Sequence, residues 1–524
     1  MTKKIMLVLV ATNCIFYLLS AQVKKAHNPV IFADVPDISM IRVKRTYYMS
    51  STTMHMSPGV PIMKSKDLVN WVLVNYAYDT LANVDDLNLI NGKSTYGKGS
   101  WASSLRYHKG TYYVSTFAQT TGKTYIYSTK NIEKGPWKTI SFSPSLHDHS
   151  LFFDDDDKAY MVYGAGKLRM VELNEDLTGT RPGTERVLIE NASTPSGTEG
   201  GLPAEGSQLF KIKDKYYLFN ITWPKGGMRT VVIHRADKLT GPWEGRIGLQ
   251  DIGVAQGGLI DTPEGNWYAY LFRDFGSVGR TPYLVPVTWE NGWPVLGVHN
   301  KVPTLLDLAS NKSLLPGIVA PDEFNRKKNE RALPLVWQWN HNPDNALWSV
   351  TERKGFLRLK TGRIDSAFLL ARNTLTQRTI GPVCTGAVSL NLSHMKDGDF
   401  AGLGLLQKNY GLAGVKMDGH NKSVVMINAG SGIPEEVAPV PLNQQIIFFK
   451  TECNFTDKKD VANFFYSLDG KSWNAIGTQL KMSYTLPHFM GYRFALFNYA
   501  TKSTGGFIDI DYFHVYDKIS KKEF

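Results

Sequence analysis

Three carboxylates stand in short segments of similar pattern, which makes them the first candidates for chemistry. The segments read Asp37-Ile38-Ser39-Met40, Asp148-His149-Ser150-Leu151 and Glu205-Gly206-Ser207-Gln208-Leu209. Gln256-Gly257-Gly258-Leu259 has the same pattern with an amide in place of the acid. Carboxylates that share a pocket push each other's pKa values apart, which divides acid from base roles. Two such groups across a sugar can hydrolyse a glycosidic bond, and a third can tune the acid. The alternative is that all three pair with Arg or Lys for folding alone.

A repeat positions these segments. Doublets with at least one aromatic residue follow turn residues and open short β-rich runs about every 47 to 65 residues. The doublets are Tyr47-Tyr48, Tyr112-Tyr113, Ala159-Tyr160, Tyr216-Tyr217 and Trp267-Tyr268. A period of this size with strand–turn–strand content predicts a β-propeller of five blades. The carboxylates lie about ten residues before their doublets, on the innermost strands, so we expect them to converge around the propeller axis.

The first three hundred residues resemble glycoside hydrolase family 43, the five-bladed β-propeller hydrolases of arabinose- and xylose-containing glycans. The segment around Pro36-Asp37-Ile38-Ser39 is similar to the one that holds the general base of the family. His147 to Phe153 matches the segment with the pKa-tuning Asp, and Ala204 to Leu209 matches the general-acid segment. The resemblance therefore implies Asp37 as base, Asp148 as tuning residue and Glu205 as acid.

The resemblance also implies a substrate-binding set. Arg280, in Gly279-Arg280-Thr281, matches an Arg that contacts the sugar and the acid–base pair, and Trp101 matches an aromatic wall of the sugar pocket. Gln256 stands where many members have a His that helps to hold an axial metal or water, and we count it with the substrate-binding residues. Because this His is replaced and no other ligand cluster is evident, we expect no metal requirement in catalysis.

The rest of the chain predicts a second all-β domain, a β-sandwich over residues 320–524 that follows a propeller over 22–315. Asp322-Glu323-Phe324 and Asp511-Tyr512-Phe513 resemble the concanavalin-like C-terminal domain of the two-domain β-xylosidases. The alternative is an independent carbohydrate-binding module. Glu323 and Asp511 are candidates for a structural calcium site or are ordinary surface acids. Cys384 and Cys453 are as well explained by buried thiols as by a disulfide.

Residues 1–21 predict a secretory signal peptide. Lys3 and Lys4 precede an apolar run that ends before Ala21, which is the pattern of a cleavable signal. The alternative is an uncleaved signal anchor. No later segment is long and apolar enough to span a bilayer, so we expect a secreted or periplasmic protein. The net charge of +12 is spread over 524 residues without a basic block, which argues against nucleic acid as a partner.

Together these features predict an exo-acting, inverting hydrolase that releases terminal xylose or arabinose from hemicellulose-derived glycans such as xylan. The alternative is a catalytically silent glycan-binding protein on the same scaffold, which the intact acid and base disfavour. The sequence leaves open the choice between β-xylosidase and α-L-arabinofuranosidase. It also leaves open whether polymer or oligosaccharide is preferred, and the oligomeric state.

Overall fold

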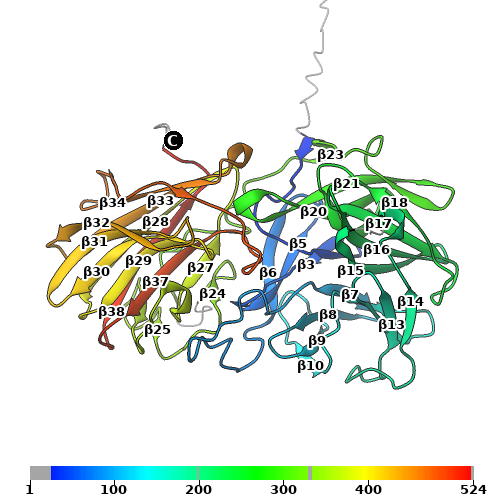
Figure 1. Cartoon of the computed structure of the whole chain (residues 1–524), viewed down its shortest axis with the longest axis horizontal. Coiled ribbons are helices and arrows are strands. Elements are labelled where there is room, and N and C mark those ends of the chain that lie inside the picture. Colours follow the sequence, from blue (N-terminus) through cyan, green and yellow to red (C-terminus); the bar gives the residue numbers. More distant parts are fainter. Residues whose placement is uncertain (1–24, 198–199, 328–332, 521–524) are drawn as a thin grey trace, which may run out of the picture.

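The computed structural model describes residues 25–197, 200–327 and 333–520. Figure 1 shows two β-rich lobes side by side, with the N-terminal half of the chain in one and the C-terminal part in the other. The predicted signal peptide, residues 1–21, lies outside the described residues. Across these ranges there is no helix of the length and apolar character needed to cross a membrane.

The first lobe is a five-bladed propeller, as predicted. Within the described residues, five antiparallel sheets of four strands each follow one another along the chain. The first blade contains β2 (Ser39–Val43), β3 (Thr46–Ser50), β5 (Gly59–Ser65) and β6 (Trp71–Tyr78). The second contains β7 (Ser104–His108), β8 (Thr111–Ala118), β9 (Lys123–Thr129) and β10 (Lys138–Phe142). The third contains β11 (Ser150–Phe153), β12 (Ala159–Tyr163), β13 (Leu168–Glu172) and β14 (Arg186–Ile189). The last two are β15 (Gly200–Ile212), β16 (Lys215–Pro224), β17 (Thr230–Ala236) and β18 (Glu244–Leu249); and β19 (Ala255–Asp261), β20 (Trp267–Asp274), β21 (Arg280–Glu290) and β22 (Trp293–Leu296).

The repeated serine has a structural role between the inner strands. The Oγ atom of Ser39 accepts a hydrogen bond from the backbone N–H of Leu105 at 3.0 Å, so the first blade is joined to the second. The same contact, at 3.1 Å and 3.0 Å, joins Ser104 to the N–H of Leu151 and Ser150 to that of Leu209. The pattern of a small polar residue before an apolar one therefore holds neighbouring blades in register around the axis.

The ring of blades is closed by the N-terminal segment. Strand β1 (Lys25–His27) pairs with β23 (Leu305–Ala309). Next to it, the side-chain amide of Asn28 donates to the carbonyls of Leu284 and Pro303 at 2.7 and 2.9 Å and accepts from the N–H of Leu284 at 3.0 Å. These bonds tie the start of the described chain to the fifth blade.

The second lobe is a sandwich of two large antiparallel sheets. One contains β24 (Gln338–Asn340), β27 (Leu375–Arg378), β29 (Asp399–Leu406), β30 (Gly411–Asp418), β31 (Asn421–Asn428), β32 (Glu435–Leu442) and β37 (Arg493–Ala500). The other contains β25 (Trp348–Ser349), β26 (Leu357–Lys360), β28 (Val383–His394), β33 (Ile446–Asn454), β34 (Val461–Ser467), β35 (Asn474–Ala475), β36 (Leu480–Lys481) and β38 (Phe507–Tyr516). Four short 3-10 helices complete the described elements: Thr194–Ser196, Gly276–Val278, Phe368–Leu370 and Thr456–Lys458.

The core of the sandwich follows the alternation of its strands. Leu390 of β28 and Leu403 of β29 belong to one buried apolar cluster. Cys384 and Cys453 lie opposite each other on β28 and β33, and both are free, buried thiols. Of the two alternatives that the sequence allows for these cysteines, buried thiols rather than a disulfide are present.

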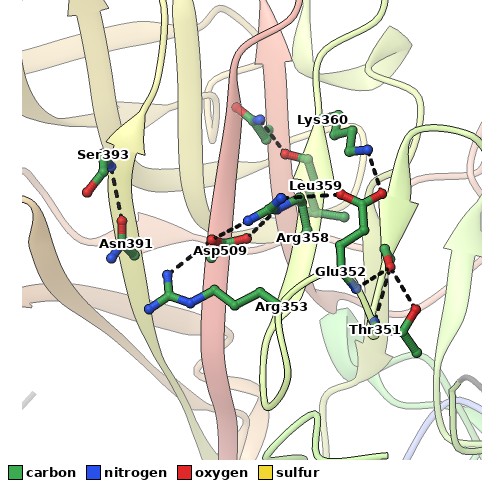
Figure 2. A network of polar contacts seen from close by, with 11 residues as sticks. Thr351, Glu352, Arg353, Arg358, Leu359, Lys360, Asn391, Ser393 and Asp509 are labelled. Carbon is green, nitrogen blue, oxygen red and sulfur yellow. Dashed lines mark hydrogen bonds and ion pairs between the residues drawn. The ribbon is translucent and has the colours of Figure 1, made fainter. Parts of the chain in front are cut away.

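A buried aspartate braces one sheet of the sandwich, as Figure 2 shows. Asp509 on β38 forms ion pairs with Arg358 at 2.7 Å and Arg353 at 3.1 Å, and its side chain is only 2% exposed. Burial favours the protonated acid, but the hydrogen bonds from Arg358 and Arg353 outweigh it and lower the pKa of Asp509.

The two lobes share a sheet. Strand β4 (Met56–Ser57), which the first blade contributes between β3 and β5, pairs with β24 at the edge of a sandwich sheet. The first blade thus contributes a strand to a sheet of the second lobe. The sandwich is therefore joined to the propeller by backbone pairing as well as by the connecting chain.

Candidate active site

The backbone turns in the same unusual way at the start of several inner strands. Asp37, Asp148 and Gln256 all have positive φ angles, of 49°, 46° and 50°. A left-handed conformation is uncommon for a residue other than glycine, and it persists where the surrounding structure enforces it. In the fourth blade the corresponding residue is Gly206, with φ 66°. Glu205 therefore lies one residue before the position that Asp37 and Asp148 occupy in their blades. The prediction that all three acids take equivalent positions is wrong by one residue for Glu205.

The cause is an irregular register in β15, which shifts on both sides of Glu205 along its pairing with β16. A β-bulge re-aims a side chain. A Cβ atom on Gly206 would lie 2.7 Å from the side-chain nitrogen of Gln256, so a larger residue there would have to displace the Gln256 side chain. Gln256 packs beside Gly206, the residue that follows Glu205, and its contact with the sugar stays a prediction.

Asp37 is buried against a cation. Its Oδ1 accepts from Nη1 of Arg280 at 2.8 Å and its Oδ2 accepts from the hydroxyl of Thr52 at 2.5 Å. The side chains of Asp37 and Arg280 are only 5% and 6% exposed. Both oxygens act as acceptors, which is the hydrogen-bonding pattern of an ionised carboxylate. Asp37 is thus arranged as a hydrogen-bond acceptor, and its role as base stays a prediction.

Arg280 makes more hydrogen bonds within the protein than the sequence suggested. Besides its ion pair with Asp37, its Nη2 donates to the backbone carbonyl of Phe489 at 3.2 Å. Its backbone N–H donates to Asp34 at 2.8 Å. The predicted contact of Arg280 with the sugar stays a prediction, whereas its contact with the base is present in the structure.

Glu205 and Asp148 form the second half of the site, together with His147. The ring Nε2 of His147 hydrogen-bonds Oε2 of Glu205 at 2.9 Å. One ligand-type atom from each of the three residues lies within 4.8 Å of the others. Asp148 is buried, whereas the side chains of Glu205 and His147 are 20% and 42% exposed. The carboxyl group of Glu205 therefore reaches solvent, whereas that of Asp148 does not.

The charges of this cluster are strongly linked. Burial, followed by the negative charges of Glu205 and Asp37, raises the pKa of Asp148 to about 7, although His147 acts in the opposite direction. Burial favours the neutral ring of His147, but the hydrogen bond with Glu205 and the charge of Asp148 outweigh it and raise the pKa of His147 to about 9. The protonation of Asp148 therefore depends on the charges of the groups that lie beside it.

Trp101 lies at the edge of this region with its ring held on both sides. It stacks parallel to Phe117, with centroids 6.4 Å apart, and Phe489 meets it edge-on at 4.7 Å. Phe489 comes from the sandwich lobe, so both lobes contribute aromatic rings at this place, and the role of Trp101 as a wall of the sugar pocket stays a prediction.

Sequence reasoning missed the contacts that bring the sandwich to the site. Asp34 is buried and accepts hydrogen bonds from the backbone N–H groups of Arg280 and Gly491, at 2.8 and 3.0 Å. Ser277 similarly donates to Asp460 of the sandwich at 2.8 Å. The only local signal was the position of Asp34 three residues before Asp37, since the partners are more than 200 residues away in the sequence.

The spacing of His147, Asp148 and Glu205 would also allow a cation. Among residues 25–197, 200–327 and 333–520, no other group of three His, Cys, Asp or Glu side chains gathers so closely. An ion would have to replace the hydrogen bond between His147 and Glu205, which already accounts for the contact. In the sandwich, Glu323 is paired with His514 at 2.7 Å, and the choice between a structural calcium site and ordinary surface acids at Glu323 and Asp511 stays open.

Comparisons with known proteins match both lobes. The family model of the glycosyl hydrolases family 43 matches residues 26–294, and that of the beta-xylosidase C-terminal concanavalin A-like domain matches 322–516. A beta-xylosidase of Formosa agariphila is 31% identical over 93% of this chain and 89% of its own length. A non-reducing end alpha-L-arabinofuranosidase of Bacteroides ovatus is 28% identical over 72% of this chain and 73% of its own.

The structural comparison agrees with the sequence comparison. A bifunctional GH43-CE protein of Bacteroides eggerthii is 68% identical and superposes with a TM-score of 0.94 over 95% of this chain. The chain spans 64% of the length of that protein. From the fold, the arrangement of the carboxylates and these matches, the chain belongs to the glycosyl hydrolases family 43.

Proposed function

We propose that the protein is an exo-acting, inverting glycoside hydrolase that releases terminal xylose or arabinose from hemicellulose-derived glycans. The observation that carries the proposal is the division of the site into two unlike halves. Asp37 is buried, paired with Arg280 and arranged as a hydrogen-bond acceptor, whereas the buried Asp148 has a raised pKa and lies beside the more exposed Glu205. Such an asymmetric pair of carboxyl sites can divide the roles of base and acid.

In the proposed mechanism, Asp37 takes a proton from a water molecule as the oxygen of that water attacks the anomeric carbon. The bond from the anomeric carbon to the glycosidic oxygen breaks, and this oxygen receives a proton from Glu205. Asp148, which lies beside Glu205, is the tuning residue of this acid, and Arg280 holds Asp37 in place. Base and acid are then restored by transfer of one proton through solvent.

The preference for a chain end and for pentoses is supported by the relatives. The names of the Formosa and Bacteroides ovatus proteins refer to a xylosidase and to a non-reducing end arabinofuranosidase, respectively. In the structure, Phe489 of the sandwich packs against Trp101 beside the carboxylates. A second lobe at this place supports a site that accepts an end of a glycan.

Two further expectations belong to the proposal. Catalysis proceeds without a metal ion, because the charges of the site are already matched by Arg280 and His147. The protein is exported, as supported by Lys3, Lys4 and the apolar run before Ala21.

The test is hydrolysis by the purified protein of 4-nitrophenyl β-D-xylopyranoside and 4-nitrophenyl α-L-arabinofuranoside, and of xylobiose. The parent should release pentose, and Glu205→Gln should lose far more activity on xylobiose than on the aryl glycosides, whose leaving groups need little protonation. The matched control is Glu172→Gln. Glu172 lies in the third blade and, like Glu205, is partly buried and ion-paired, and its variant should keep full activity. A parent that binds these sugars without cleaving them would instead be a glycan-binding protein.

A further inference from the structure

His147 is held rigidly beside the acid by three separate contacts. Its backbone carbonyl accepts from the N–H of Gly164 at 3.0 Å. Its ring meets that of Phe117 nearly edge-on, with centroids 5.3 Å apart. Its Nε2 contacts Glu205 at 2.9 Å. The ring therefore has a defined direction although its side chain is 42% exposed.

The neighbouring His149 shows that this direction is specific. His149 is buried and points away, donating from Nδ1 to the carbonyl of Leu146 at 2.8 Å and contacting Ser115 through Nε2 at 2.9 Å. Burial lowers the pKa of His149 to about 4, so its ring is neutral at ordinary pH. The positive φ of Asp148 separates the two rings, and only His147 is brought to Glu205.

The contact uses one oxygen of Glu205 and leaves the other available. Oε2 is occupied by His147, so Oε1 is the oxygen that can carry a proton toward the sugar. As the leaving oxygen takes this proton, negative charge develops on Glu205. A hydrogen-bond donor fixed at 2.9 Å from that carboxyl group stabilises the developing charge without having to reorganise.

We propose that His147 is a positioning residue for the general acid: it holds Oε2 of Glu205 so that Oε1 faces the leaving group, and it stabilises the carboxylate left after proton transfer. This inference rests on the proposed function, because it requires Glu205 to act as the acid. It adds a fourth residue, His147, to the three carboxylates, and it assigns that residue to bond cleavage rather than to activation of water.

Two variants separate the parts of this role. His147→Leu removes both the donor and the charge, whereas His147→Gln keeps an N–H donor at a similar reach without the charge. His147→Leu should lower kcat on xylobiose by at least about tenfold, because effective acid catalysis is worth about 100-fold or more. It should leave kcat on 4-nitrophenyl xyloside nearly unchanged, and His147→Gln should recover much of the loss on xylobiose.

The pH profile gives an independent readout. The groups that face His147 are Asp148 and Glu205, with Asp37 and its partner Arg280 beyond them. A protonated His147 is a positive charge 2.9 Å from a carboxyl oxygen, and a positive charge favours the loss of a proton from a neighbouring acid. The alkaline limb of kcat/KM should therefore move to higher pH in both variants.

The controls distinguish the possible failures. His420→Leu changes an exposed histidine in the sandwich and should alter neither rate, and thermal melting establishes that each variant is folded. An equal loss on both substrates, or no loss on xylobiose, would overturn the inference while Glu205→Gln still shows its leaving-group effect. If Glu205→Gln itself lacks that effect, Glu205 is not the acid, and the proposed function and this inference are both overturned.

Discussion

The replacement of Asp37 by Asn changes two properties of the protein at once, and the structure sets the size of each. Asn keeps the shape of the side chain but removes the base. Loss of a general base costs about 100-fold or more in turnover, or about 3 kcal/mol in activation free energy. The same change leaves the guanidinium of Arg280 buried without its ion-pair partner. Breaking a buried pair costs about 3–5 kcal/mol of folding stability, and the nearby carboxylate of Asp34 places the loss toward the lower end.

Asp509→Asn is the matched control for the stability effect. Asp509 is as deeply buried as Asp37 and pairs with Arg358 at 2.7 Å, but it lies in the sandwich (Figure 2). The variant should also lose stability, because it breaks the buried ion pairs of Asp509 with Arg358 and Arg353, while Arg358 keeps its contact with Glu352. It should keep its turnover at any temperature at which it is folded, since Asp509 belongs to the bracing network of the sandwich.

The assay has two stages. Urea unfolding first gives the free energy of unfolding of both variants and the parent. Initial rates on 4-nitrophenyl xyloside are then measured at a temperature where all three are folded. Asp37→Asn and Asp509→Asn should both be less stable than the parent, and only Asp37→Asn should be inactive. The reasoning is refuted if Asp37→Asn retains parental turnover, or if its lost activity equals its unfolded fraction.

Three other outcomes are expected. Burial and the charges of Glu205 and Asp37 raise the pKa of Asp148 to about 7, well above its value in the unfolded chain, so Asp148 opposes folding increasingly as pH rises from about 4 to 7 and fully above that. Asp148→Asn should therefore lower activity yet raise the melting temperature above pH 7, with the gain vanishing near pH 4; an equal gain at all pH values would contradict this. Activity should survive chelator, and its loss with an unchanged melting curve, restored by calcium, would show a catalytic metal. Phe489→Ala should raise KM more than it lowers kcat, because it removes one support of Trp101; unchanged KM would speak against a two-lobed wall.

The propeller could be predicted because its signals are local and repeated. Each blade has its own doublet with at least one aromatic residue, and three of the five inner strands begin with a serine that bonds the next blade. These features recur within about 65 residues, so one sequence suffices to see them. The pairing of the sandwich strands was visible only as alternation, since partners such as β28 and β38 are far apart in the chain.

The site was less predictable for physical reasons. The identity of the acids could be inferred from their segments, but the bulge that places Glu205 one residue out of correspondence depends on the pairing of β15 with β16. The contacts of Arg280 with Asp37 and Phe489 join residues more than 200 positions apart. His147 was visible only as a neighbour of Asp148, because its direction depends on a positive φ that sequence patterns do not reveal.

The stereochemistry of the first product tests the central claim most directly. Asp37 and Glu205 come from the first and fourth blades, so they approach the sugar from different sides of the axis. An inverting enzyme holds its two carboxyl groups about 6.5–9.5 Å apart, which leaves room for water. Proton NMR of xylose as it is released from a β-xyloside should therefore show the α-anomer first. The appearance of the β-anomer first would mean retention and would contradict the roles given to Asp37 and Glu205.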